Sequence, residues 1–264
     1  MADPETEEQA RRAIWDFLAH RRRDGRKIVH LVSYPRSGNT LAREYFSILQ
    51  GRSQLSVYAG DLVTSTDTAL THALDGIELI KSHTMPTDDG PMIYLVRDGR
   101  NATLSFLYMT FLFGGHRFSE LAELYDGIRH LDAVEGAWAD HVGLALRQRE
   151  LRPTLFVRHE DLVRAPGTAL AQMAQFLNAE ISADVLDDCV RRQKASGSYA
   201  ANPYNGYQFQ PAPGSIYDIL KRHRRDDYWR LIFDGRSKRY FHDRGGTEPL
   251  LHFGYEHSAD WWKE

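Results

Sequence analysis

A polar loop stands between an apolar segment and a segment of helical character near the start of the chain. The loop runs from Tyr34 to Thr40 (Tyr-Pro-Arg-Ser-Gly-Asn-Thr) and follows an apolar run from Ile28 to Val32. It combines a cation, a glycine and hydroxyl side chains. Such a turn directs backbone N–H groups and the positive end of a helix dipole at one point, which is how proteins bind phosphate-like anions. We therefore expect an anion site here.

A second loop of similar design begins at Arg97. The segment from Arg97 to Arg100 reads Arg-Asp-Gly-Arg and directly follows another apolar run, and Ser105 lies eight residues beyond Arg97. A guanidinium offers a bidentate fork to phosphate, and a hydroxyl one turn into a helix adds to the dipole. The two loops together predict an anion with two separate phosphoryl ends.

Two more polar clusters follow apolar runs. Lys81-Ser82-His83 ends one of these runs, and His159-Glu160-Asp161-Leu162 follows another. Because the carboxyl ends of parallel strands meet at one edge of a sheet, we expect all four clusters to lie along that edge.

The elements that must position these clusters alternate between strands and helices. This alternation predicts an α/β fold with a central parallel sheet flanked by helices. The expected strands are Lys27 to Ser33, Gly76 to Ser82, Met92 to Val96 and Thr154 to Val157. The expected helices are Glu7 to His20, Thr40 to Gln50, Arg100 to Phe111, Leu131 to Glu150, Pro166 to Leu177 and Ser182 to Lys194.

Composition narrows the class of protein. The chain has 264 residues and a net charge of −3, which argues against a general nucleic-acid or membrane-surface binder. Its single cysteine, Cys189, can form neither an intrachain disulfide nor a cysteine-based metal site, and it fits a reducing compartment. The acidic N-terminus is no secretory signal, and no apolar run is long enough to span a membrane. These features predict a soluble, cytoplasmic protein.

In order and spacing, the four clusters resemble the sulfotransferases that use 3′-phosphoadenosine 5′-phosphosulfate (PAPS). In that family the first loop typically reads Tyr-Pro-Lys-Ser-Gly-Thr-Thr, the middle strand ends in Lys-Thr-His, and the second loop carries Arg and Ser eight residues apart. The His159 segment is similar to the family's Tyr-Glu-Asp segment. The likeness spans about Lys27 to Lys194 and suggests a cytosolic-type, bacterial, small-molecule member. It implies a three-layer P-loop-like fold in a single domain, residues 1–264, with PAPS as co-substrate and no metal.

Carried over position by position, the resemblance implies how the donor is bound. The amides and hydroxyls of the first loop would hold the 5′-phosphosulfate, through Ser37, Gly38, Asn39 and Thr40. Arg97 and Ser105 would hold the 3′-phosphate, and His159 would lie near the adenine. Leu41 stands where the family often has a tryptophan. The family's C-terminal Arg-Lys-Gly motif is not recognisable, and the basic run from Lys221 to Arg225 is a candidate substitute.

The resemblance also implies the catalytic residues. His83 is the candidate general base, since an imidazole with a pKa of about 6.5 suits proton abstraction at neutral pH. Arg36 would neutralise charge on the bridging oxygen and the leaving phosphate, and Lys81 would position the sulfuryl group. The family usually has lysine where Arg36 stands, and arginine keeps the charge but resists deprotonation.

The residues also permit structural interpretations. Arg36 would then be a surface turn residue, His83 a strand-end histidine with a structural hydrogen bond, and Arg97 a partner of Asp98 or Glu160. Ser105 would lie on a helix surface, and His159 would be a helix-entry residue. The competing functions are a P-loop kinase, which would want Gly-x-x-x-x-Gly-Lys-Ser/Thr and magnesium, and a catalytically inactive nucleotide-binding module.

The acceptor is expected to be a small molecule or a carbohydrate: a phenol, a glycan or a glycosylated natural product. Residues 196–215 hold three prolines, three glycines and several aromatic residues, which predicts a lid over the acceptor. The sequence makes no prediction about oligomeric state.

Overall fold

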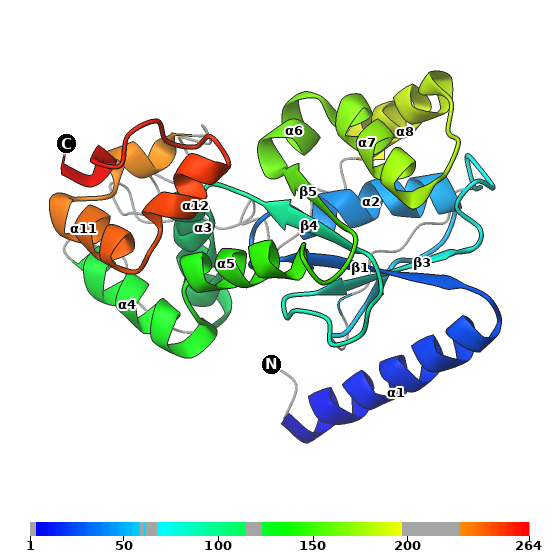
Figure 1. Ribbon diagram of the computed structural model, residues 1–264, viewed down its shortest axis with the longest axis horizontal. Coiled ribbons are helices and arrows are strands. Elements are labelled where there is room, and N and C mark those ends of the chain that lie inside the picture. The colour runs from blue at the N-terminus through cyan, green and yellow to red at the C-terminus, as the bar shows by residue number, and fades with distance from the viewer. Residues whose placement is uncertain (1–3, 59–60, 62–67, 115–122, 197–226, 264) are drawn as a thin grey trace. The chain divides into compact units, whose positions relative to one another are not determined.

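The computed structural model describes residues 4–58, 61, 68–114, 123–196 and 227–263. The chain divides into two compact units (Figure 1). The sheet unit consists of Met1–Ser33, Ser37–Val96 and Gln148–Tyr199, and the helical unit of Tyr34–Arg36, Arg97–Arg147 and Ala200–Glu264. The single domain expected over residues 1–264 stays a prediction.

The sheet unit holds a five-stranded sheet in the order β2-β3-β1-β4-β5, in which every neighbouring pair is parallel. The predicted central parallel sheet is confirmed, and each of the four predicted strands is found to within one residue. The short strand β2 was not predicted. The strands are β1 (Lys27–Ser33), β2 (Leu55–Ser56), β3 (Ile77–Ser82), β4 (Met92–Val96) and β5 (Thr154–Arg158).

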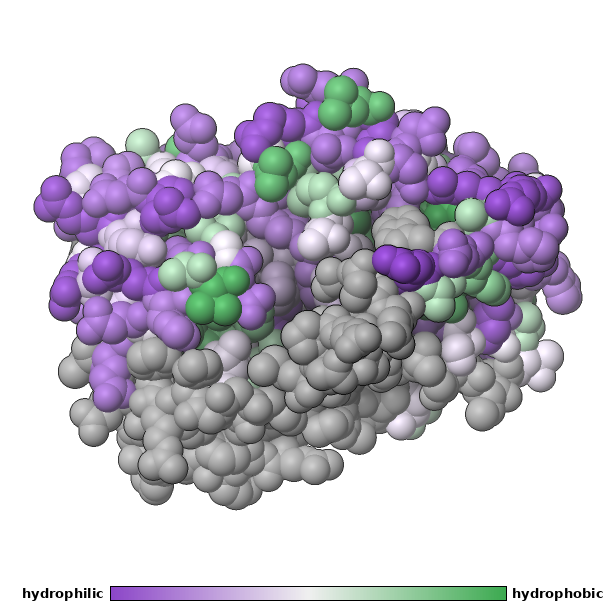
Figure 2. Space-filling view, turned by 90° about the horizontal axis from the view of Figure 1, so that it is seen from below, coloured by the Kyte–Doolittle hydropathy of each residue, from purple (hydrophilic) through white to green (hydrophobic). Residues whose placement is uncertain are grey.

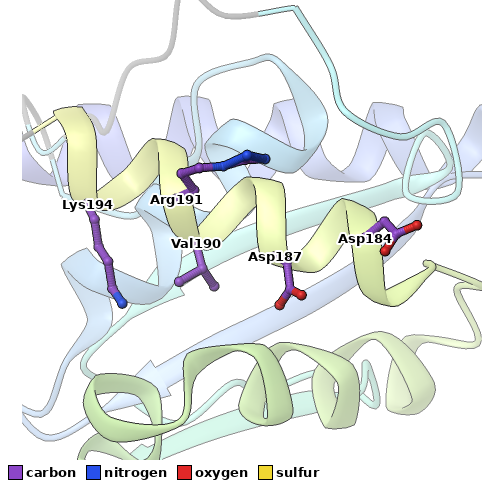
Figure 3. Close-up of a pocket in the computed structure, with 5 residues that line it drawn as sticks. All are labelled: Asp184, Asp187, Val190, Arg191 and Lys194. Atoms are coloured by element: carbon purple, nitrogen blue, oxygen red, sulfur yellow. The ribbon is translucent and has the colours of Figure 1, made fainter.

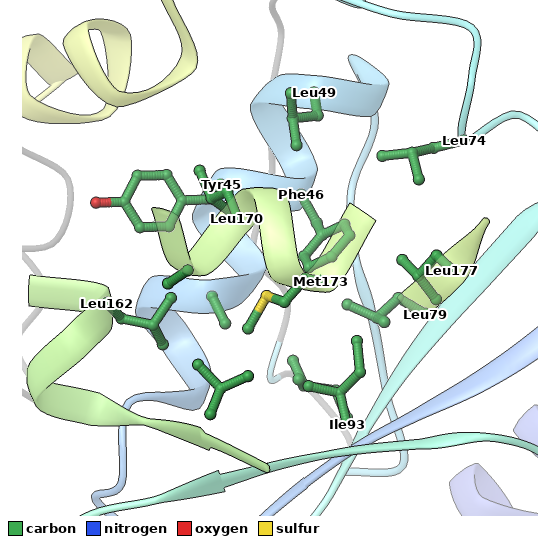
Figure 4. Packing of buried hydrophobic residues seen from close by; sticks show 14 of the residues in the cluster. Tyr45, Phe46, Leu49, Leu74, Leu79, Ile93, Leu162, Leu170, Met173 and Leu177 are labelled. Atoms are coloured by element: carbon green, nitrogen blue, oxygen red, sulfur yellow. The ribbon is translucent and has the colours of Figure 1, made fainter. Parts of the chain in front are cut away.

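Helices cover both faces of this sheet (Figure 1). Side chains on β1 alternate between the faces, so Val29 and Leu31 enter one core cluster while Ile28 enters another. The larger cluster packs beneath α2 (Asn39–Gln50), α7 (Pro166–Leu177) and α8 (Ala183–Ser196), as Figure 4 shows for several of its members. The smaller cluster includes Leu18 of α1 (Pro4–Arg23). The short helix α6 (His159–Arg164) directly follows β5.

The helical unit contains α3 (Gly99–Gly114), α4 (Leu124–Glu135), α5 (Trp138–Gln148) except its last residue, α11 (Gly235–Asp243) and α12 (Thr247–His252). It also holds two 3-10 helices, η3 (Tyr228–Leu231) and η4 (Trp261–Lys263). The prediction of one helix from Leu131 to Glu150 is wrong. Gly136 adopts a positive φ of 84° between α4 and α5, and this conformation ends the first helix.

Hydrophilic side chains dominate the described part of the surface in Figure 2, and hydrophobic ones form small separate patches. The described residues include no helix that is both long and apolar enough to cross a membrane. The predicted cytoplasmic location stays a prediction.

Candidate functional site

The first anion loop ends at the beginning of α2. Gly38 precedes the helix with φ 100° and ψ 9°, and the N–H of Ala42 donates to the Gly38 carbonyl over 3.1 Å. No side chain among the described residues caps this helix start. The first amides of a helix have no partner within it, so those of Asn39, Thr40 and Leu41 point toward the loop with the positive end of the dipole. This arrangement suits an anion.

His159 packs directly against the turn of the loop. A Cβ added to Gly38 would lie 2.7 Å from His159 Cδ2, closer than real Cβ contacts come. His159 begins α6 and is 9% exposed. The loop thus needs glycine at position 38 for two reasons, its positive φ and the imidazole beside it. The helix-entry interpretation of His159 describes its place in the chain correctly, and its predicted place near adenine stays a prediction.

The side chains of Ser37, Asn39 and Thr40 differ in their burial and in their hydrogen bonds. Ser37 is buried, and its Oγ has no hydrogen-bond partner among the residues that the structure describes. Asn39 turns inward, where its Nδ2 donates to the Leu31 carbonyl over 3.2 Å and to Ser33 Oγ over 3.3 Å. The Asn39 side chain therefore ties the loop to β1, and its backbone amide is the group that stays assigned to the predicted anion. Thr40 is half-buried.

His83 follows β3, and its ring is held by β1. Its Nδ1 lies 2.7 Å from the Ser33 carbonyl oxygen. A carbonyl can only accept, so Nδ1 of the neutral ring carries the proton and Nε2 carries the lone pair. The backbone N–H of His83 donates to the Tyr58 hydroxyl over 3.1 Å, and the two rings lie 5.5 Å apart. The ring is thus oriented in the tautomer that a general base requires.

Lys81 lies on β3, two residues before His83, and is 8% exposed. Its Nζ donates to Asp61 Oδ2 over 2.5 Å and lies 4.4 Å from the centre of the Tyr58 ring. Burial lowers the pKa of Lys81, while the carboxylate of Asp61 acts to raise it. The predicted role of Lys81 in positioning the sulfuryl group stays a prediction.

In the helical unit, three predicted residues come together. Arg97 Nη1 donates to the Arg36 carbonyl over 3.0 Å, and Arg36 Nε donates to Ser105 Oγ over 3.1 Å. Arg36 has a φ of 68°, which is uncommon for a residue with a side chain. Asp98, the partner suggested for Arg97, instead accepts hydrogen bonds from Arg100. Their ligand roles stay predictions.

Sequence reasoning missed two residues beside this machinery, Tyr58 and Asp61. Both follow the short strand β2, and both contact residues that lie more than 15 positions away in the chain. No local motif marks them, so only the pairing of β2 with β3 reveals them.

The two hollows described on the surface contain none of the predicted site residues. One, of about 600 Å³, runs along α8 and is lined by Asp184, Asp187, Val190, Arg191 and Lys194 (Figure 3). Its lining comes from a single helix and mixes both signs of charge. The other, of about 800 Å³, surrounds the end of α7. The expected lid and the basic run from Lys221 to Arg225 lie outside the described residues, except Ser196.

A family model for the sulfotransferase domain matches residues 26–202, which is more than half of the chain. The chain therefore belongs to the sulfotransferase domain family. The predicted membership among PAPS-dependent sulfotransferases, and with it the prediction of an enzyme, is confirmed. Within the described residues, no group of three or more His, Cys, Asp or Glu side chains is arranged to hold a metal ion.

Individual relatives are distant in sequence. Sulfotransferase 1B1 of Mus musculus is 23% identical over 235 residues, covering 80% of this chain and 76% of the relative. Sulfotransferase 1B1 of Canis lupus familiaris is 22% identical over 234 residues, covering 80% and 77%.

Solved structures of similar fold confirm the P-loop-like α/β class. Mouse sulfotransferase SULT7A1 complexed with PAP has a TM-score of 0.58 and 16% identity, covering 85% of this chain and 84% of that one. Retinol dehydratase in complex with androsterone and the inactive cofactor PAP has a TM-score of 0.55 and 17% identity, covering 84% and 80%.

Proposed function

We propose that this enzyme transfers a sulfuryl group from PAPS to a hydroxyl of a small-molecule or carbohydrate acceptor, with His83 as general base. The observation that carries the proposal is the 2.7 Å contact from His83 Nδ1 to the Ser33 carbonyl. This contact leaves the lone pair on Nε2. His83 follows the end of β3, and β3 pairs with β1, the strand that leads into the anion loop. Strand β3 also carries Lys81, as the resemblance to sulfotransferases implies.

The loop residues fit a phosphosulfate group. Gly38 keeps the turn open, since a Cβ there would meet His159 at 2.7 Å. The buried Ser37 Oγ, without a partner among the described residues, is a ready donor to an anionic oxygen. We assign the 5′-phosphosulfate to Ser37, Gly38 and the amides of Asn39 and Thr40. The 3′-phosphate is assigned to Arg97 and Ser105, and the adenine to the neighbourhood of His159.

In this proposal His83, Arg36 and Lys81 each have a defined task in the reaction. PAPS, when bound, supplies the sulfuryl group, and 3′-phosphoadenosine 5′-phosphate (PAP) departs with the electron pair of the broken S–O bond. His83 Nε2 takes the proton of the acceptor hydroxyl as that oxygen forms its bond to sulfur. Arg36 offsets the negative charge that develops on the leaving phosphate, and Lys81 positions the sulfuryl oxygens. No residue needs to change its oxidation state, and no metal enters the scheme.

The acceptor class is argued from the relatives. Retinol dehydratase, one of the proteins of similar fold, is complexed with androsterone in one structure and with retinol in another, and both are apolar small molecules that carry a hydroxyl. A phenol or an alcohol of similar size is therefore the first acceptor class to assay. Carbohydrate acceptors form the second.

Replacement of His83 by alanine tests the proposal. We expect turnover of ³⁵S-labelled PAPS to fall by about 10²- to 10⁴-fold, as for loss of a general base. PAP affinity, measured by calorimetry, should stay near the wild-type value. His72→Ala is the control, because His72 is exposed and bonded only to Asp75 among the contacts described. Full turnover in His83→Ala would refute the base assignment.

Two parallel assays address the competing functions. Transfer of label from γ-labelled ATP, and none from PAPS, would favour the kinase. PAP binding by the wild-type protein without transfer to any acceptor in a broad screen would favour the inactive module.

A further inference from the structure

Asp61 connects three elements of the sheet unit through its carboxylate and carbonyl. From α2, Arg43 donates to the Asp61 carbonyl over 2.9 Å and to Oδ1 over 2.7 Å. From β3, Lys81 Nζ donates to Oδ2 over 2.5 Å, and from β2, Ser56 Oγ donates to Oδ2 over 2.9 Å. Arg43 is 1% exposed and lies in the first turns of the helix that the anion loop leads into. Asp61 thus joins α2, the helix that follows the anion loop, to β3, the strand that carries Lys81.

Tyr58 extends the same connection to His83. Its hydroxyl accepts the His83 backbone N–H over 3.1 Å, and its ring lies 4.4 Å from Lys81 Nζ. Its own N–H donates to Ser56 Oγ over 3.2 Å, and that hydroxyl bonds Asp61. The segment that follows β2 therefore contacts Lys81 and His83, the two residues at the end of β3 to which we assign a role in the reaction.

We propose that Asp61 is a positioning residue for sulfuryl transfer, which holds the Lys81 ammonium and joins the strand end bearing His83 to the helix of the anion loop. The proposal rests on the proposed function, in which Lys81 and His83 act on the sulfuryl group and the acceptor. Asp61 itself does not touch the reacting atoms. Its action goes through Lys81.

Charge and burial explain why a carboxylate is needed at this place. Lys81 has a long flexible side chain, and burial penalises its charged form. Burial also acts on Asp61, but Lys81 and Arg43 hold the pKa of its carboxyl well below the usual range, so Asp61 is ionised at neutral pH. Two cations share one anion, which leaves the cluster with a net positive charge. Asp61 therefore keeps Lys81 both protonated and fixed in direction.

The first measurement follows Lys81 directly and needs no turnover. The protein is labelled with ¹³C-lysine, and the Lys81 resonance is assigned by its loss in Lys81→Gln. In Asp61→Asn we expect the titration midpoint of Lys81 to fall by about one pH unit or more, since an opposite charge at this distance is removed. Tyr58 and Arg43, the other groups facing Lys81 in this cluster, are unchanged in that variant.

Glu78→Gln is the matched control. Glu78 lies at the other end of β3, is 1% exposed, and bonds two arginines, Arg21 and Arg52. Its replacement also leaves two partly buried cations without their carboxylate, so Glu78→Gln controls for the loss of stability that we expect in Asp61→Asn. It contacts neither Lys81 nor His83 in the described structure. We expect the Lys81 midpoint and kcat of Glu78→Gln to match the wild type.

The second measurement is a double-mutant cycle on turnover. We expect Asp61→Asn to lower kcat by about 10- to 100-fold, the effect of misplacing a reacting group, with the KM for PAPS and the Kd for PAP within about threefold of wild type. The double variant Asp61→Asn/Lys81→Gln should show no larger decrease in kcat than Lys81→Gln alone, because Asp61 acts through Lys81. This double variant returns the net charge of the cluster to its wild-type value, so its comparison with Lys81→Gln also serves if Asp61→Asn folds poorly.

The outcomes separate this proposal from the function on which it rests. A lowered Lys81 midpoint together with non-additive losses supports the positioning role. An unchanged midpoint, or losses that multiply in the double variant, overturns it. If wild type transfers sulfate to no acceptor, the proposed function fails, and the Lys81 midpoint still decides whether Asp61 holds the ammonium.

Discussion

Replacing Gly38 by alanine separates two restraints that act on the anion loop. The first is conformational: Gly38 has a φ of 100°, and a residue with a Cβ in left-handed space costs about 1–2 kcal/mol. The second is steric: the new Cβ would lie 2.7 Å from His159 Cδ2, and overpacking typically costs about 1–3 kcal/mol. We expect Gly38→Ala to lower the free energy of unfolding by about 2–5 kcal/mol.

Other glycines of the sheet unit provide controls for each restraint. Gly25 has a φ of 77°, but a Cβ added there would meet nothing within 4 Å, so Gly25→Ala should show the conformational cost alone. Gly76 has neither a positive φ nor a close neighbour, so Gly76→Ala should be near neutral. The assay is urea unfolding followed by circular dichroism. The steric part should be recovered when His159→Ala is added to Gly38→Ala, as a coupling energy of about 1–3 kcal/mol.

Donor binding gives a second readout of the same variant. Distortion of the turn moves the amides that begin α2, and loss of one charge-assisted hydrogen bond corresponds to about 10- to 100-fold in affinity. Gly38→Ala should therefore weaken PAP binding by that factor, while Gly25→Ala should leave it unchanged. The reasoning is refuted if Gly38→Ala is as stable as Gly76→Ala, or if removing the His159 ring recovers nothing.

Three further predictions concern the rest of the chain. Burial raises the pKa of Asp132 to about 6, so its contribution to stability is greatest below about pH 4 and is lost as the pH rises through 6; Asp132→Asn should flatten the unfolding free energy across that range. Arg100→Ala leaves the buried Asp98 without its cation and leaves the half-buried Glu256 with Arg230 at 3.5 Å; we expect it to destabilise by about 3–5 kcal/mol, measured by tryptophan fluorescence in urea. Burial raises the pKa of the Cys189 thiol to about 12, so iodoacetamide should label it only after unfolding.

The sheet was predictable because its strands are marked by their own residues. Lys27–Ser33 and Met92–Val96 are continuous apolar runs bounded by polar turns, and a fully buried parallel strand has that pattern. Strand β2 lacks it. Leu55–Ser56 is only two residues long and is a strand because it pairs with Ile80 and Lys81. These partners lie 25 positions further along the chain, so the residues around β2 do not predict the pairing.

The same distinction applies to the candidate site. The anion loop, the lysine near the end of β3, the histidine that follows this strand and the arginine after β4 are predictable, because each stands at the carboxyl end of an apolar strand. Asp61 is not, since its role depends on Arg43 and Lys81 reaching it from two other elements. The break at Gly136 likewise escaped prediction, since an isolated glycine inside a helical pattern does not by itself require a positive φ.

The contact between Arg36 and Ser105 bears on why an arginine stands where this family usually has lysine. The guanidinium is a planar fork with donors on three nitrogens, and its Nε donates to Ser105. Ser105 Oγ, which accepts from Arg36, still has its own proton to donate, and the hydroxyl is thereby oriented rather than consumed. A lysine ammonium is a point charge at the end of a flexible chain and has no second nitrogen with which to do both. In the proposed function, Arg36 would therefore combine charge neutralisation with the orientation of a predicted phosphate ligand, at the expense of any proton donation to the leaving group.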